Sequence, residues 1–578
     1  MSGLTRRWAP RWNVLVVAAL VLAATLGQGV VGPVPVSGAD SYVPVSGAGS
    51  TWSENALDQW IRDVQQYGMR VNYAGTGSTD GWQEFLNGTV DFAASDIPFQ
   101  SHPEDGSAPE DPAAGSYAYM PITAGGTAFM YNLNINGQRV TNLRLSGENL
   151  SKILTGVITN WDDPALAADN PGLRLPNLAI VPVVRSDGAG DTFELTQWMI
   201  SQYPSLWTAY CQRSGRAPAC GPTSFYPTVS GMIGQSGDLG VAGYISQSYA
   251  DGSIGYVNYS YALNAGFPVA QLLNAAHYYT EPTPQNVAVS LLDAQIDTTD
   301  VNDPSLYLTE QLGNVYTDPD PRTYPLSSYS YLILPTTVQG QFTKDKGTTL
   351  AAFSYYAMCQ GQQESASLGY SPMPMNLVQA SFTQIAKIPG AVVQDINLQS
   401  CDNPTFSSAQ GANANLLAET APYPPACDLQ GATQCSTGTG GATAQTPVQP
   451  GSPAAVAASH GTGVSNGGSG GSGGGGGSSG GGVGVAGAAG AGGTAGGATS
   501  DQGGQGCAAA ACPAGASTGT SSTGAGTDPS ENPQNLATTR DWLGTGLSLA
   551  VLLGLLAILL VPALIVLRRR RPGPGVAP

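Results

Sequence analysis

Three glycine-rich turns in the first third of the chain carry hydroxyl residues and each precedes a probable helix. They are GAGST (47–51), GTGST (75–79) and DGAGDT (187–192). The first N–H groups of a helix have no internal partners and carry partial positive charge, so such turns can hold an anion. Arg185, just before the third turn, could add a formal positive charge. Each turn alone is also typical of an ordinary capped helix, but the three with an arginine indicate an anion-binding site.

Other kinds of functional site find little support in the sequence. No glycine run is followed by the GK[ST] of a nucleotide-binding P-loop, and no GxSxG nucleophile elbow lies on a suitable strand and helix. His102, His277 and His460 lie in unrelated contexts, which disfavours a Ser-His-Asp triad. No CxxC pair occurs, so a metal site is the weaker interpretation. We therefore expect a binding protein with no catalytic residue, no metal and no cofactor.

The turns belong to a repeated strand–turn–helix pattern. It occurs at residues 43–64, 70–88 and 179–200, and a further strand (90–98, VDFAASDIP) ends at an aspartate. Strands that alternate with helices predict an α/β fold with a largely parallel sheet, in which ligands bind at the carboxyl ends of the strands. Core packing is expected for five tryptophans at helical or turn spacing: Trp60, Trp82, Trp161, Trp198 and Trp207.

The overall charge of the chain is acidic. Of its 578 residues only 10% are charged, and the formal net charge is −18. Binding of nucleic acid requires basic patches, so this composition argues against it. Binding of a small anion remains compatible with this acidic composition, because one arginine and a ring of backbone N–H groups can form a buried anion-binding site.

Both ends of the chain carry apolar segments. Basic residues, an apolar run and a small-residue cleavage pattern predict a signal peptide over residues 1–39, with an uncleaved anchor as the alternative. Residues 543–567 are long enough to span a bilayer, and the arginines that follow predict a cytoplasmic basic tail at 568–578. Between 436 and 540, the Gly/Ser/Ala-rich composition predicts a disordered linker. We expect a secreted protein tethered to the outer face of the cytoplasmic membrane by this single C-terminal span.

The cysteines suit an oxidising compartment. Pairing between neighbours is the simplest of many possible connectivities, and it gives Cys211 with Cys220, Cys359 with Cys401, Cys427 with Cys435, and Cys507 with Cys512.

Four sequence motifs occur in a fixed order along the chain: GAGSTW (47–52), VNYAGTGST (71–79), VDFAASDIP (90–98) and RSDGAGDTF (185–193). With these motifs the chain resembles the extracytoplasmic phosphate-binding proteins of ABC transporters, over about residues 43–400. The resemblance implies a two-lobed periplasmic-binding-protein fold (type II-like) with a hinge. Its first lobe would comprise residues 43–126 and 262–400, and its second lobe residues 127–261. Such a protein closes around inorganic phosphate and passes it to an ABC permease in the membrane.

The resemblance also implies roles for individual residues. Asp96 would accept a hydrogen bond from a protonated phosphate oxygen, which selects against sulfate because sulfate carries no proton at neutral pH. Arg185 would supply positive charge, and Asp187 would hold its guanidinium in place. The complete implied set of phosphate contacts is Thr51, Trp52 through its backbone N–H, Ser78, Asp96, Arg185, Ala189, Gly190 and Asp191.

The third turn departs from the family pattern DGSGT. Ala189 stands in place of a serine and Asp191 in place of a threonine, although Thr192 could offer a replacement hydroxyl. Each missing donor would be worth about 1.5–3 kcal/mol to a charged acceptor. Asp191 could cap its own helix and point away from the cleft, or lie in the site and demand a more protonated phosphate. It could also mark a less anionic ligand or the loss of tight binding. A surface adhesion or sensor module of the same fold is therefore the alternative function.

Overall fold

The computed structural model describes residues 42–445, except residue 114 and residues 407–413. These residues fall within one compact unit of the chain. The predicted signal peptide, the transmembrane segment, the basic tail, the Cys507–Cys512 pair and the linker beyond residue 445 lie outside the described residues. Among the helices of residues 42–445 that can be examined, none combines the length and the apolar character needed to cross a membrane.

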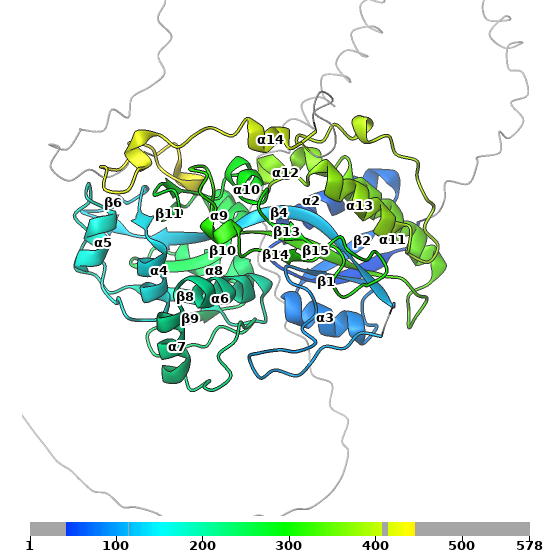
Figure 1. Ribbon diagram of the computed structural model, residues 1–578, viewed down its shortest axis with the longest axis horizontal. Coiled ribbons are helices and arrows are strands. Elements are labelled where there is room, and N and C mark those ends of the chain that lie inside the picture. The colour runs from blue at the N-terminus through cyan, green and yellow to red at the C-terminus, as the bar shows by residue number, and fades with distance from the viewer. Residues whose placement is uncertain (1–41, 114, 407–413, 446–578) are drawn as a thin grey trace, which may run out of the picture. The chain divides into compact units, whose positions relative to one another are not determined.

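An 11-stranded mixed sheet runs through the molecule (Figure 1). Its main path is β2 (Val71–Gly75), β1 (Val45–Gly49), β3 (Phe92–Ser95), β15 (Ser327–Pro335), β4 (Tyr117–Asn132), β10 (Ser253–Asn258), β8 (Val181–Arg185) and β9 (Ile233–Gln235). A branch from β4 consists of β11 (Val269–Leu273), β12 (Tyr279–Thr280) and β7 (Arg144–Leu145). Two small hairpin-like pairs are β5 (Asn134–Ile135) with β6 (Gln138–Arg139), and β13 (Gln295–Ile296) with β14 (Glu310–Gln311).

Strand β4 joins the two halves of this sheet. All of its 16 residues are buried. Residues 117–126 of β4 pair with β15, and residues 127–132 pair with β10. We call β2, β1, β3, β15 and residues 117–126 of β4 the first half of the sheet. Residues 127–132 of β4 with β10, β8 and β9 form the second half.

The sheet is mixed, and the expectation of a largely parallel sheet is wrong for its centre. Strands β2, β1 and β3 are parallel, as are β10, β8 and β9. At the centre, β15 is antiparallel to both of its neighbours, and β4 is antiparallel to β10. The reason is that β4 carries the chain out of the first half while β15 returns along it, so these strands run in opposite directions.

Helices cover both halves of the sheet (Figure 1). On the first half, α2 packs against β2, and α3 packs against β1 and β3; on the second half, α8 packs against β8, β9 and β10. The helices are α2 (Glu54–Val64), α3 (Ser78–Leu86), α4 (Gly147–Leu154), α5 (Pro164–Asp169), α6 (Gly190–Gln202), α7 (Pro204–Arg213), α8 (Gly237–Ile245), α9 (Tyr259–Ala265), α10 (Pro284–Ser290), α11 (Lys344–Met358), α12 (Gln362–Leu368), α13 (Met375–Ile385) and α14 (Leu416–Glu419). The five tryptophans predicted in the core are all buried.

The three predicted disulfides within the described residues are confirmed. They are Cys211–Cys220, Cys359–Cys401 and Cys427–Cys435. The Cys427–Cys435 bridge lies in a segment beyond the expected end of the folded head, residue 400.

Residues 414–445 belong to the folded head. Helix α14 packs against α10, and farther on Thr439 donates its backbone N–H to the carbonyl of Thr141 at 2.9 Å. Thr439 and Ala442 are buried. The predicted start of the linker at residue 436 is therefore too early, because Thr439 bonds to the carbonyls of Thr141 and of Val269 on β11, and the turn Gly440–Ala442 packs against α9. Strand β11, which sequence assigned to the first lobe, also pairs with the second-half part of β4.

Candidate anion-binding site

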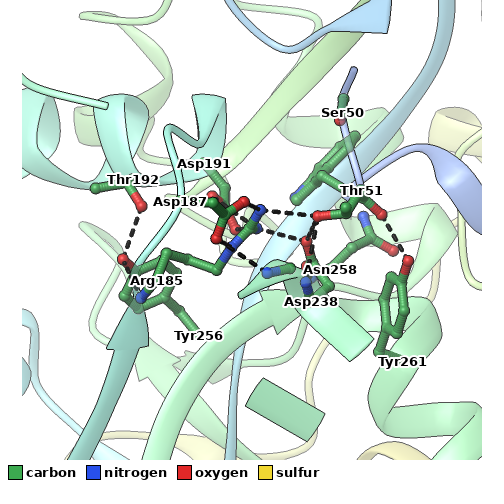
Figure 2. Close-up of polar contacts among 12 residues, drawn as sticks. Ser50, Thr51, Arg185, Asp187, Asp191, Thr192, Asp238, Tyr256, Asn258 and Tyr261 are labelled. Carbon is green, nitrogen blue, oxygen red and sulfur yellow. Dashed lines mark hydrogen bonds and ion pairs between the residues drawn. The ribbon is translucent and has the colours of Figure 1, made fainter. Parts of the chain in front are cut away.

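The sequence motifs converge at the carboxyl ends of the strands. Ser50 and Thr51 follow β1, Ser78 opens α3 after β2, and Asp96 follows β3 in the first half. Arg185 ends β8 in the second half. Thr51 and Arg185 are in direct contact, with Arg185 Nη2 donating to Thr51 Oγ1 at 2.8 Å, so side chains from both halves meet at one place (Figure 2).

Arg185 is at the centre of this cluster, and its side chain is only 1% exposed. Its Nε donates to Asp187 Oδ1 at 2.9 Å, and its Nη2 donates to Asp187 Oδ2 as well as to Thr51. Its Nη1 donates to Asp238 Oδ2 at 2.6 Å and to both carboxylate oxygens of Asp191 at 3.2 Å. The contact expected between Asp187 and Arg185 is thus present. These bonds occupy all five N–H groups of a guanidinium.

Asp238 is a site residue that the sequence reasoning missed. It is fully buried at the start of α8. Besides Arg185, it accepts the Thr51 hydroxyl at 2.6 Å and the backbone N–H of Asn258 at 2.6 Å. The signal was available, because GQSGDLG (234–240) is a fourth glycine-containing turn before a helix, and Gly237 has a φ of +68° that favours glycine.

Asp96 lies in a separate group of hydroxyl donors on the first half. Ser50 Oγ lies 2.7 Å from its Oδ1 and 2.8 Å from its Oδ2, Ser330 Oγ donates to Oδ1 at 2.8 Å, and Ser78 Oγ donates to Oδ2 at 3.2 Å. Burial, with a smaller contribution from nearby Asp238, raises the pKa of Asp96 to about 6 against the lowering effect of these hydroxyls. Asp96 is therefore ionised above this pH, and its carboxylate can accept a hydrogen bond from a protonated ligand oxygen. Ser50 and Ser330 were not predicted as site residues.

The start of α6 lies directly against this group. A Cβ placed on Gly190 would be 2.7 Å from Asp96 Cβ and 3.0 Å from Ser78 Oγ. Two residues before Gly190, the carbonyl of Gly188 accepts the backbone N–H of Thr79 at 3.0 Å. Only glycine at position 190 permits this approach, so the helix N-terminus in the second half faces Ser78 and Asp96 in the first half.

The side chain of Asp191 points toward Arg185, which rules out the interpretation of Asp191 as the cap of its own helix (Figure 2). The N-cap position is Ala189, whose backbone is extended, and Asp191 lies in the first turn of α6. Burial raises the pKa of Asp191 well above its ordinary value, Arg185 opposes that rise, and Asp238 adds to it. Asp191 is thus a buried carboxyl group inside the candidate site.

The remaining predicted residues have other side-chain contacts. The Thr192 hydroxyl lies 2.7 Å from the hydroxyl of Tyr256 on β10, so it is engaged away from Arg185 (Figure 2). The Trp52 indole is buried and its Nε1 donates to Thr127 Oγ1 at 3.3 Å. The predicted role of Trp52 concerned its backbone N–H and stays a prediction, as do the backbone roles of Ala189 and Gly190.

The two halves also touch at loops beyond these residues. The Arg216 guanidinium pairs with Asp105 at 3.5 Å, and the backbone N–H of Gly221 donates to the carbonyl of Glu104 at 3.2 Å. Among the described residues, no group of three or more His, Cys, Asp or Glu side chains is arranged to hold a metal ion. What the site offers is hydrogen-bond donors, one arginine and several carboxylates.

Comparisons with known proteins agree with this arrangement of motifs. A family model described as the PBP superfamily domain matches residues 25–360. The phosphate-binding protein PstS of Xylella fastidiosa (strain Temecula1 / ATCC 700964) is 31% identical over 340 residues, which cover 58% of this chain and 83% of that protein. PstS of Haemophilus influenzae (strain ATCC 51907 / DSM 11121 / KW20 / Rd) is 29% identical over 356 residues, 61% of this chain and 95% of that protein.

Among solved structures, a phosphate-binding protein from Stenotrophomonas maltophilia is 17% identical, with a TM-score of 0.40, over 68% of this chain and 99% of that one. The family match covers more than half of the chain, and the X. fastidiosa relative is covered over more than two thirds of its length. The chain belongs to the PBP superfamily and, within it, to the family of phosphate ABC transporter substrate-binding proteins.

Proposed function

We propose that this protein binds inorganic phosphate between the two halves of its sheet, outside the cytoplasmic membrane, and delivers it to an ABC permease. The observation that carries the proposal is the meeting of Thr51, Ser78 and Asp96 from the first half with Arg185 and the start of α6 from the second. The relatives that match the chain are named for phosphate binding. We therefore also propose that binding involves no covalent chemistry, in line with the names of these relatives.

The chemistry of the cluster suits a protonated oxyanion. Arg185 supplies positive charge, and the N-terminus of α6 directs backbone N–H groups and partial positive charge toward the same place. Ionised Asp96 can accept a hydrogen bond from a protonated phosphate oxygen, whereas it would repel the unprotonated oxygens of sulfate. Preference for phosphate over sulfate is therefore expected above the pKa of Asp96, about 6.

Groups from both halves would contact one ligand, so binding would stabilise the closed arrangement of the halves. In this proposal strand β4, which pairs in both halves, would keep them connected as they move. The permease would then receive phosphate when the halves separate.

The test is calorimetric titration of the purified full-length chain with phosphate and, separately, with sulfate. We expect saturable heat with phosphate and none with sulfate at pH 7.5. Ser78→Ala should weaken phosphate binding by about 10-fold or more, because it removes a hydroxyl beside Asp96, while Ser201→Ala, an exposed serine of α6, should leave it unchanged. No heat at millimolar phosphate from pH 5 to 8 would refute the proposal.

One observation favours the alternative, a surface adhesion or sensor module that has lost anion binding. All N–H groups of Arg185 are already bonded to protein oxygens. A folded chain that binds neither phosphate nor sulfate would support this second function.

A further inference from the structure

A ligand that reaches Arg185 has to displace one of the guanidinium's present partners. Those partners are Asp187, Asp191, Asp238 and the Thr51 hydroxyl. Since a guanidinium has five N–H groups and all are used, a phosphate oxygen cannot simply be added. The effect of charge and pH on phosphate binding therefore depends on which of these partners leaves the guanidinium.

Asp191 is the partner that is held most weakly. Asp187 binds Arg185 through both oxygens and also accepts the backbone N–H of Gly237 at 2.9 Å. Asp238 is held by Thr51 and by the backbone of Asn258 as well as by Arg185. The hydrogen bonds of the Asp191 carboxylate go to Arg185 alone, at 3.2 Å, which is longer than the 2.6–2.9 Å of the other measured contacts of this guanidinium.

An ionised Asp191 that left Arg185 would be a buried charge without a partner. The residue is 2% exposed, and three further carboxylates lie nearby. Breaking a buried ion pair in this way is strongly unfavourable. A protonated Asp191 would avoid this cost, because its O–H could donate to the incoming phosphate instead of accepting from Arg185.

We propose that Asp191 competes with phosphate for Arg185 and that phosphate enters the site together with one proton, which Asp191 carries. This inference rests on the proposed function and describes how pH controls phosphate binding at that same site. In a pH range where Asp191 is ionised in the free protein, affinity for phosphate falls as pH rises. In a range where Asp191 is already protonated, this dependence disappears.

Other titratable and charged groups face Asp191 from each neighbouring element, and their effects have to be separated from its own. They are Arg185 and Asp187 from β8 and the turn after it, Asp238 from α8, Asp96 from the end of β3, and Tyr256 from β10. All of them, and the phosphate itself, are common to the natural chain and to an Asp191→Asn variant. The ratio of the two dissociation constants therefore isolates the proton of Asp191.

The experiment measures phosphate dissociation constants of the natural full-length chain and of Asp191→Asn from pH 5 to 9. We expect Asp191→Asn to bind more tightly at the alkaline end. The ratio of the two constants should rise by up to tenfold per pH unit above the pKa of Asp191 and be constant below it. Asp191→Thr, which restores a hydroxyl, should show the same gain.

Calorimetry of the natural chain and of both variants in two buffers of different protonation enthalpy counts the protons directly. At the alkaline end of the series the natural chain should take up one proton per phosphate more than a folded variant does, and at the acid end it should take up the same number. Equal affinities for the natural chain and both variants at every pH, with equal proton uptake, would overturn the inference while leaving phosphate binding in place. No phosphate binding by any of the three proteins would instead refute the proposed function.

Discussion

Asp96 gives a prediction about stability that requires no ligand. Its carboxyl group is buried, and three serine hydroxyls donate to it. The pKa of Asp96 is about 6 in the folded protein, against an ordinary value of 3.8. The ionisation of Asp96 should make the free energy of unfolding depend on pH. We expect Asp96→Asn to abolish this contribution, because asparagine has nearly the same shape and does not titrate.

The sign and size follow from the two pKa values. A raised folded-state pKa means that the folded protein holds the proton more tightly than the unfolded chain does. The resulting stabilisation is complete below about pH 4 and is lost as pH rises through about 6. Because one pKa unit corresponds to about 1.4 kcal/mol, the difference between 3.8 and about 6 amounts to about 3 kcal/mol.

The assay is urea unfolding of both proteins between pH 4 and pH 7.5 without phosphate, in a buffer of constant ionic strength. Across this range the natural chain should lose about 2.5 kcal/mol relative to Asp96→Asn, most of the full difference. Constant effects of the substitution, such as altered serine hydrogen bonds, cancel in the comparison across pH. A stability difference that does not change between pH 4 and pH 7.5 would refute the reasoning that burial controls the ionisation of Asp96.

Three further substitutions test the packing around the site and the C-terminal segment. Gly190→Ala should weaken phosphate binding about tenfold or more in a calorimetric titration, because its Cβ would lie 2.7 Å from Asp96 Cβ; unchanged affinity would contradict the close approach of α6. Thr51→Val should lower the free energy of unfolding by about 1–3 kcal/mol in urea, since it leaves buried polar partners unsatisfied. Arg144→Met should lower it by about 3–5 kcal/mol by leaving buried Asp428 unpaired, and a loss below 1 kcal/mol would show that residues 426–442 do not depend on this ion pair.

The features that could be predicted from sequence are those determined locally. Strand–turn–helix units around residues 47–51 and 187–192 follow from hydrophobic periodicity and glycine-rich turns. The confirmed disulfides join cysteines that are neighbours in the order of the chain. The positions of Asp96 and Arg185 at strand ends follow from the same local patterns.

What could not be predicted depends on which strands become neighbours. Asp238 is 53 residues from Arg185 along the chain, and the two meet because Arg185 pairs with Gln235 where β8 lies beside β9. Thr51 is 134 residues from Arg185 and reaches it only across the two halves of the sheet. The direction of the Asp191 side chain could not be predicted for the same reason. Its carboxylate could bond either to Arg185 or to the N–H groups at the start of its own helix, and the choice depends on where the fold places Arg185.

A structure of the full-length chain determined with saturating phosphate would show directly where the anion binds and which partner of Arg185 it replaces. We expect phosphate between the two halves, with oxygens within hydrogen-bond distance of Arg185, Ser78 and the backbone N–H of Gly190, and with Asp191 no longer accepting from Arg185. Phosphate bound elsewhere, or a site in which Asp191 keeps both contacts to Arg185 while phosphate is bound, would contradict this expectation.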